Sequence, residues 1–149
     1  MSVRVEDRGE SKTNYVYQTY QLAIRVGKLV ANKPKKYRMN YGDHIIELSL
    51  RAWEHTQEAN NIYMTKDTSI TDYKLRRKYL LMARGEIKHL SSAVSLFLDL
   101  TLGETASDSK SMNAEKTMQT KAEIGGKCSE IIKMINGVIN HDRLLVDKS

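Results

Sequence analysis

Proline occurs once in this 149-residue chain, at position 34, and long helical patterns fill most of the sequence around it. A proline ends a helix because its ring fixes φ and removes a backbone donor, so a chain with one proline can form helices many turns long. Apolar residues recur at three- and four-residue steps in four segments, which is the spacing of one helical face. No segment alternates apolar and polar residues over a useful length, so no strand is expected.

The spacing predicts helices over about residues 13–32, 41–63, 72–101 and 112–140. The predicted buried face of the first helix is Val16, Tyr20, Ala23, Gly27 and Val30. That of the third is Arg76, Tyr79, Leu80, Ala83, Ile87, Leu90, Val94, Phe97, Leu98 and Thr101. That of the fourth is Met118, Ala122, Gly125, Cys128, Ile132, Ile135 and Ile139.

Short connections between amphipathic helices favour antiparallel neighbours. We therefore expect an all-α fold, an antiparallel up-down-up-down four-helix bundle over residues 12–142. Residues 1–11 are expected to form a disordered N-terminal tail, and residues 143–149 a C-terminal tail. Glycine inside a helix costs about 1 kcal/mol relative to alanine. The pair Gly125-Gly126 therefore suggests close helix packing, within the bundle or between subunits.

Charge and composition narrow the function classes. A net charge of +6 favours polyanionic partners such as nucleic acid. No run of 18 apolar residues occurs, so no membrane partner is expected. The N-terminus lacks the apolar core of a signal peptide, and a single cysteine suits a reducing compartment, so a cytoplasmic location is expected.

Basic residues gather in two places, the turn around the proline and the first half of the third helix. Tyrosines near the first cluster, Tyr37 and Tyr41, are able to stack on unpaired bases. A charge run is commonly only a solvated face, but two such clusters favour nucleic-acid or partner binding. The candidate binding residues are Lys33, Lys35, Lys36, Arg38, Lys74, Arg76, Arg77, Lys78, Arg84 and Lys88.

Motifs for catalysis or metal binding are weak. Glu86 and His89 form one Glu-x-x-His step, whereas a di-iron bundle needs two such steps and two further glutamates, so we interpret them as a solvated surface pair. Cys128 lies on an apolar stripe and is expected to be a buried small hydrophobe. No phosphate-binding glycine loop occurs. We expect no enzymatic activity, no catalytic residue, no metal and no cofactor.

Three segments resemble a bacterial four-helix-bundle family. Residues 33–38, Lys-Pro-Lys-Lys-Tyr-Arg, resemble its F-P-K-x-x-R-Y turn, residues 58–63 its A-N helix end, and residues 72–83 the opening of its third helix. The family comprises the accessory variability determinants (Avd) of diversity-generating retroelements and related proteins encoded in intervening sequences of ribosomal RNA genes. The fourth helix of the family often has an aromatic-rich G-x-x-x-x-W spacing. This chain departs from that pattern, because its fourth helix has Gly125-Gly126 and no tryptophan.

This resemblance implies a non-enzymatic partner of a reverse transcriptase, a basic homopentamer that binds the enzyme, the template RNA and the cDNA in mutagenic retrohoming. It singles out Lys35, Lys36 and Arg38 with Arg76, Arg77 and Lys78. Wide apolar helix faces independently favour a homo-oligomer, with Tyr15, Tyr17, Tyr20 and Trp53 as surplus apolar surface.

Two alternatives to the reverse-transcriptase partner remain open. The first is an RNA- or protein-binding protein of the ribosomal-RNA branch. The second is a ribonuclease resembling the HEPN enzymes, in which Arg84 and His89 would match the Arg-x4–6-His signature. A basic helix face explains the same two residues without a catalytic role.

Overall fold

The computed structural model describes residues 14–102 and 110–147, and every regular element in these residues is helical. The elements are α2 (Asn14–Ala31), α3 (Lys35–Tyr37), the π-helical turn η2 (Arg38–Gly42), α4 (Asp43–Asn60), α5 (Ile70–Leu102) and α6 (Lys110–Asp147). The all-α prediction is confirmed, with no strand in the described ranges.

Two helix boundaries differ from the predicted ones by six or more residues. Pro34 stands directly before α3 with φ −56° and ψ 144°, and the helical run resumes at Lys35 rather than at residue 41. Proline is favourable at a helix start, where no backbone donor is needed. α6 continues to Asp147, so the predicted C-terminal tail is wrong for residues 143–147. The predicted N-terminal tail, the loop 103–109 and residues 148–149 lie outside the described residues.

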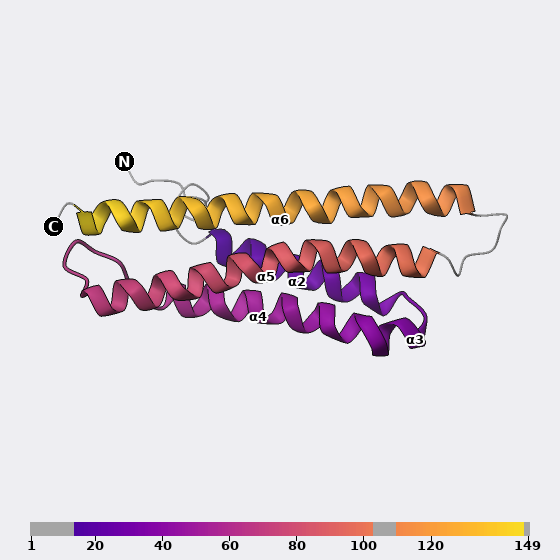
Figure 1. Ribbon diagram of the computed structural model, residues 1–149, viewed down its shortest axis with the longest axis horizontal. Helices are drawn as coiled ribbons and strands as arrows, with labels where there is room; N and C mark the ends of the chain where they lie inside the picture. The colour runs from indigo at the N-terminus through magenta and orange to yellow at the C-terminus, as the bar shows by residue number, and fades with distance from the viewer. Residues whose placement is uncertain (1–13, 103–109, 148–149) are drawn as a thin grey trace.

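The four long helices run along the length of the molecule (Figure 1). α4 packs most extensively on α5, α5 packs on α6, and α2 contacts both α4 and α6. The contacts therefore form a closed ring around one core. The turn at α3 lies at one end of the molecule, and the start of α5 lies at the other (Figure 1).

One apolar core runs through the ring of helices. All four helices contribute aliphatic or aromatic side chains that are at most 2% exposed, among them Leu22, Ile45, Phe97 and Ile135. Full burial of each such side chain contributes about 1.5–3 kcal/mol. The predicted face of α5 is confirmed at every position but Tyr79, which is only partly buried.

The predicted faces of α2 and α6 are partly wrong. α2 buries Tyr15, Thr19, Leu22, Val26, Leu29 and Val30. This face is shifted by one residue, because Leu22 and Val26 offer more aliphatic surface to bury than Ala23 and Gly27. In α6, Met118 and Ala122 are exposed, and the core positions are Ile124, Cys128, Ile131, Ile135 and Val138.

Only one of the described helical glycines is required by packing. A Cβ atom built on Gly42 would lie 2.5 Å from Cγ1 of Val30, a buried and rotationally stiff side chain. Glycine therefore lets the π-helical turn lie against α2. A Cβ on Gly126 would meet nothing within 4 Å, and one on Gly125 would make only an ordinary contact with Ser91. The predicted close packing at Gly125-Gly126 is therefore wrong within the chain.

Among the described residues, no helix offers an apolar stretch of the length and hydropathy needed to cross a bilayer.

Candidate nucleic-acid interface

Four candidate cations lie on one exposed side of α5, which we call the α5 basic face: Lys74, Arg77, Lys78 and Lys88. At about 100° per residue, these four positions fall within about 100° of one another around the helix axis. None forms an ion pair with a carboxylate in the described part of the chain. The aliphatic side chains of Leu81 and Met82 join the first three around a shallow hollow. The surface therefore combines unpaired positive charge with accessible apolar atoms.

Arg76 does not belong to this face, although the sequence places it in the same cluster. Its side chain is 9% exposed, and its Nε donates to Oδ2 of Asp142 at 2.6 Å. Its Nη1 donates to the backbone oxygens of Ala59 (3.0 Å) and Ile62 (2.9 Å). The prediction that Arg76 contacts nucleic acid is therefore corrected: it ties the end of α4 to α5 and α6.

Arg84 and His89 lie toward different neighbours of α5. Nη1 of Arg84 donates to Oδ1 of Asn136 on α6 at 2.7 Å. The ring of His89 instead stands edge-on to His44 of α4, with 5.8 Å between centroids. One subunit therefore does not bring the two side chains of the Arg…His motif together.

The proline turn presents a second group of cations, at the opposite end of the molecule from the start of α5 (Figure 1). Lys35 and Lys36 are exposed, and Nζ of Lys36 lies 5.0 Å from the centre of the Tyr37 ring. The Tyr37 and Tyr41 rings are 6.4 Å apart, and Tyr41 is exposed. Arg38 is half-buried. The two predicted clusters are therefore separate surfaces.

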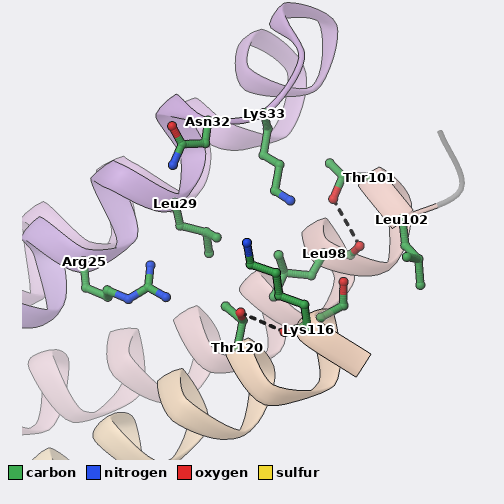
Figure 2. Close-up of a pocket in the computed structure, with 10 residues that line it drawn as sticks. Arg25, Leu29, Asn32, Lys33, Leu98, Thr101, Leu102, Lys116 and Thr120 are labelled. Carbon is green, nitrogen blue, oxygen red and sulfur yellow. Dashed lines mark hydrogen bonds between the residues drawn. The ribbon is translucent and has the colours of Figure 1, made fainter. Parts of the chain in front are cut away.

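Lys33 takes part in an arrangement that the sequence did not predict. It lines a cavity of about 320 Å³ where the end of α2, the end of α5 and the first part of α6 meet. Figure 2 shows its ammonium group, that of Lys116 and the guanidinium of Arg25 pointing toward one space. We call this space the three-cation cavity. Its other lining residues are Leu29, Asn32, Leu98, Thr101, Leu102, Thr117 and Thr120.

Electrostatics in the cavity favour a bound anion. Burial, together with the positive charge of Lys116, lowers the pKa of Lys33. Arg25 forms two hydrogen bonds to Glu123, at 3.0 and 3.1 Å, and these raise the pKa of Arg25 and lower that of Glu123. Lys33 and Lys116 have no carboxylate partner in the residues described. The cavity therefore holds two uncompensated positive charges.

Sequence reasoning missed Arg25 and Lys116. Each is an isolated cation on a long helix, separated from Lys33 along the chain. Only the packing of α2 against α6 brings the three together, so no local pattern could have identified them.

The side chain of Glu86 is not part of a solvated pair with His89. Its Oε1 accepts a hydrogen bond from Nδ1 of His55 on α4 at 2.6 Å, and both side chains are less than a fifth exposed. The His55 ring also stacks on Tyr79 at 6.0 Å. The interpretation as a surface pair is therefore wrong for Glu86. No cluster of three potential metal ligands occurs among the residues searched, 14–102 and 110–147.

Cys128 is buried, as expected for a small hydrophobe in the core. Burial raises the pKa of its thiol to about 11. Because the thiolate is the reactive form, this environment disfavours nucleophilic chemistry.

An apolar surface covers the junction of α2 and α4. Tyr17, Tyr20 and Ile24 of α2 and Ile46 and Leu50 of α4 are each 37–57% exposed. We call these five residues the α2/α4 apolar surface. Tyr20 packs against Trp53 at 5.6 Å, which links the two helices. Tyr15, expected to add to this surplus surface, is instead buried.

No protein-family model, no curated protein and no solved structure matches this chain.

Proposed function

We propose that this protein is a non-enzymatic accessory protein of a diversity-generating retroelement, as its resemblance to the Avd family implies. It binds a reverse transcriptase together with template RNA and cDNA in mutagenic retrohoming, in the cytoplasm. The main support for nucleic-acid binding is the α5 basic face. Its cations are exposed and have no carboxylate partner in the described residues. Such cations gain most from phosphates, because no internal ion pair has to be broken.

The fold we propose for this role is an antiparallel up-down-up-down four-helix bundle. The closed ring of contacts among α2, α4, α5 and α6 supports it, since each helix has two packed neighbours. In this topology the proline turn and the start of α5 lie at opposite ends. The two basic surfaces are then able to contact separate stretches of one nucleic acid, or nucleic acid and protein.

We also propose that the protein is a homo-oligomer, a pentamer by resemblance. The α2/α4 apolar surface supports self-association because it joins five exposed apolar side chains across two helices. Gly27 lies on α2 as well, and a Cβ atom added to it would meet nothing within 4 Å. A neighbouring subunit is therefore able to approach the backbone of α2 closely.

Reverse-transcriptase binding is the property that separates this proposal from the ribosomal-RNA branch. The experiment is a pull-down of a reverse transcriptase encoded beside this gene, with and without RNA, at 50 and 200 mM salt. Retention of the enzyme by the protein is the expected result. RNA binding without retention of the enzyme would favour the ribosomal-RNA branch.

The ribonuclease alternative is tested in the same preparations. Incubation with a generic RNA should leave it intact, because Arg84 and His89 lie toward α6 and α4 respectively. Cleavage that is lost in His89→Ala would favour a HEPN-like ribonuclease over the accessory protein.

A further inference from the structure

The three-cation cavity differs from the α5 basic face in shape and charge. The two surfaces therefore suit different ligands. The face is an open helix surface, whereas the cavity is bounded by three helices and holds about 320 Å³. That volume lies at the lower end of the range for small-ligand sites. An internal phosphodiester carries a sugar on each side, and the cavity would have to accommodate both. A terminal phosphate carries only one sugar.

Charge balance also favours a terminal group. Glu123 offsets the charge of Arg25, which leaves the charges of Lys33 and Lys116 without a counter-charge in the described residues. A phosphate monoester carries between about 1.5 and 2 negative charges near pH 7, because its second pKa is about 6. A phosphodiester carries one. A monoester therefore matches the two lysines better than any internal phosphate.

Polar residues also line the cavity. Asn32 and Thr117 are two of them. The hydroxyls of Thr101 and Thr120 already donate to the backbone oxygens of Leu98 (3.1 Å) and Lys116 (3.0 Å), as Figure 2 shows. Each bond lies within one helix, so these two hydroxyl hydrogens are already used. Charge-assisted hydrogen bonds from lysine and arginine are the stronger contacts to a phosphate.

We propose that the three-cation cavity, formed by Arg25, Lys33 and Lys116, binds the terminal phosphate monoester of a nucleic-acid strand. This inference rests on the proposed nucleic-acid binding and adds recognition of a strand end. Burial, and next to it the charge of Lys116, lowers the pKa of Lys33, and a bound dianion opposes both effects because it favours the charged ammonium.

The test compares binding of one 12-nucleotide RNA with a 5′-phosphate, a 3′-phosphate or hydroxyls at both ends, at fixed salt. The full chain should bind at least one phosphorylated form about tenfold more tightly than the hydroxyl form. Lys33→Gln with Lys116→Gln should remove this preference, so that the double variant binds all three RNAs with equal affinity. Lys133→Gln, an exposed α6 cation outside the cavity, should keep the preference.

The outcomes separate this inference from the proposed function. Equal affinity of the parent protein for all three RNAs overturns the cavity inference and leaves RNA binding standing. Absence of binding to any of them contradicts the proposed function itself. Because the comparison of RNAs uses the parent protein, it stays decisive even if the double variant does not fold.

Two further probes identify other sources of anion. Inorganic phosphate that removes the preference, with no effect on the hydroxyl form, supports the phosphate site. A hexaglutamate peptide that binds the parent but not the double variant, without any phosphate preference among the RNAs, would assign the cavity to an acidic protein segment and overturn the inference.

Discussion

The guanidinium of Arg76 on α5 and the carboxylate of Asp142 on α6 form a buried ion pair, with 2.6 Å between Nε and Oδ2. Two backbone oxygens, of Ala59 and Ile62, accept the remaining hydrogen bonds from Nη1. Arg76 thus binds one carbonyl in the last turn of α4 (Ala59) and one just beyond that helix (Ile62). It fixes three helices at the end of the molecule opposite the three-cation cavity.

Removal of one partner of this pair should destabilise the fold strongly. Asp142→Ala leaves the Arg76 charge buried without its counter-ion, and the free energy of unfolding should fall by about 3–5 kcal/mol. Denaturant unfolding measures this change. Replacement of both residues together, Arg76→Met with Asp142→Leu, should cost much less. Arg77→Ala is the matched control and should stay within about 0.5 kcal/mol of the parent.

The α5 basic face should set the salt dependence of RNA binding. The variant Lys74→Gln, Arg77→Gln, Lys78→Gln should reduce the slope of log affinity against log salt by about 2, since each contact with a single strand contributes about 0.7. Helicity should not change, because all three side chains are exposed. The control removes three exposed cations elsewhere, Lys66→Gln, Lys133→Gln and Arg143→Gln. A triple variant that binds RNA with the parent's slope would remove the basis of the proposed interface.

The α2/α4 apolar surface should hold subunits together. Leu50→Lys places a charge on this surface and should shift the protein from an oligomer toward the 17.1 kDa monomer in light scattering. Leu144→Lys on α6 is the control, because Leu144 is also about half exposed but lies outside the surface. A parent protein that is monomeric at micromolar concentration would contradict the proposed self-association.

Gly42 and Gly126 should respond to alanine in opposite directions. Gly42→Ala forces a methyl group against Val30 and should destabilise by about 1–3 kcal/mol. Gly126→Ala meets open space and should stabilise α6 by up to about 1 kcal/mol. Thermal unfolding of both variants measures the difference. A stabilising Gly42→Ala would mean that α2 and η2 are not packed as described.

Stability should fall as the pH rises above 9. Burial raises the pKa of Cys128 from 9.0 to about 11 and that of Tyr15 from 10.0 to about 12. The folded state therefore favours the protonated thiol, whose contribution is complete below pH 9 and is lost as the pH approaches 11. For Cys128 alone the loss is about 3 kcal/mol. Unfolding of the parent and of Cys128→Ala at pH 8 and pH 11 should show a smaller loss in the variant.

The sequence by itself determined the helical class and the buried face of α5. Apolar residues recur every three or four positions over long segments, and only one proline interrupts them. Helices are the secondary structure that buries residues with this spacing. Along α5 one series of apolar residues runs most of the length of the helix, so the face that is buried follows from the sequence. In α2 two series one residue apart both fit the spacing, and packing against α4 and α6 decided between them.

Only the tertiary structure decided what each cation does. The helical period already places Arg76 on the buried face of α5 and Arg77 on the exposed side. The carboxylate that Arg76 meets, Asp142, is 66 residues away along the chain and reaches it only through the packing of α6 on α5. Arg25, Lys33 and Lys116 come together through helix packing alone. Charge counted along a sequence reports how many cations a segment carries. Whether a cation meets a carboxylate, a carbonyl or solvent depends on the helix packed beside it.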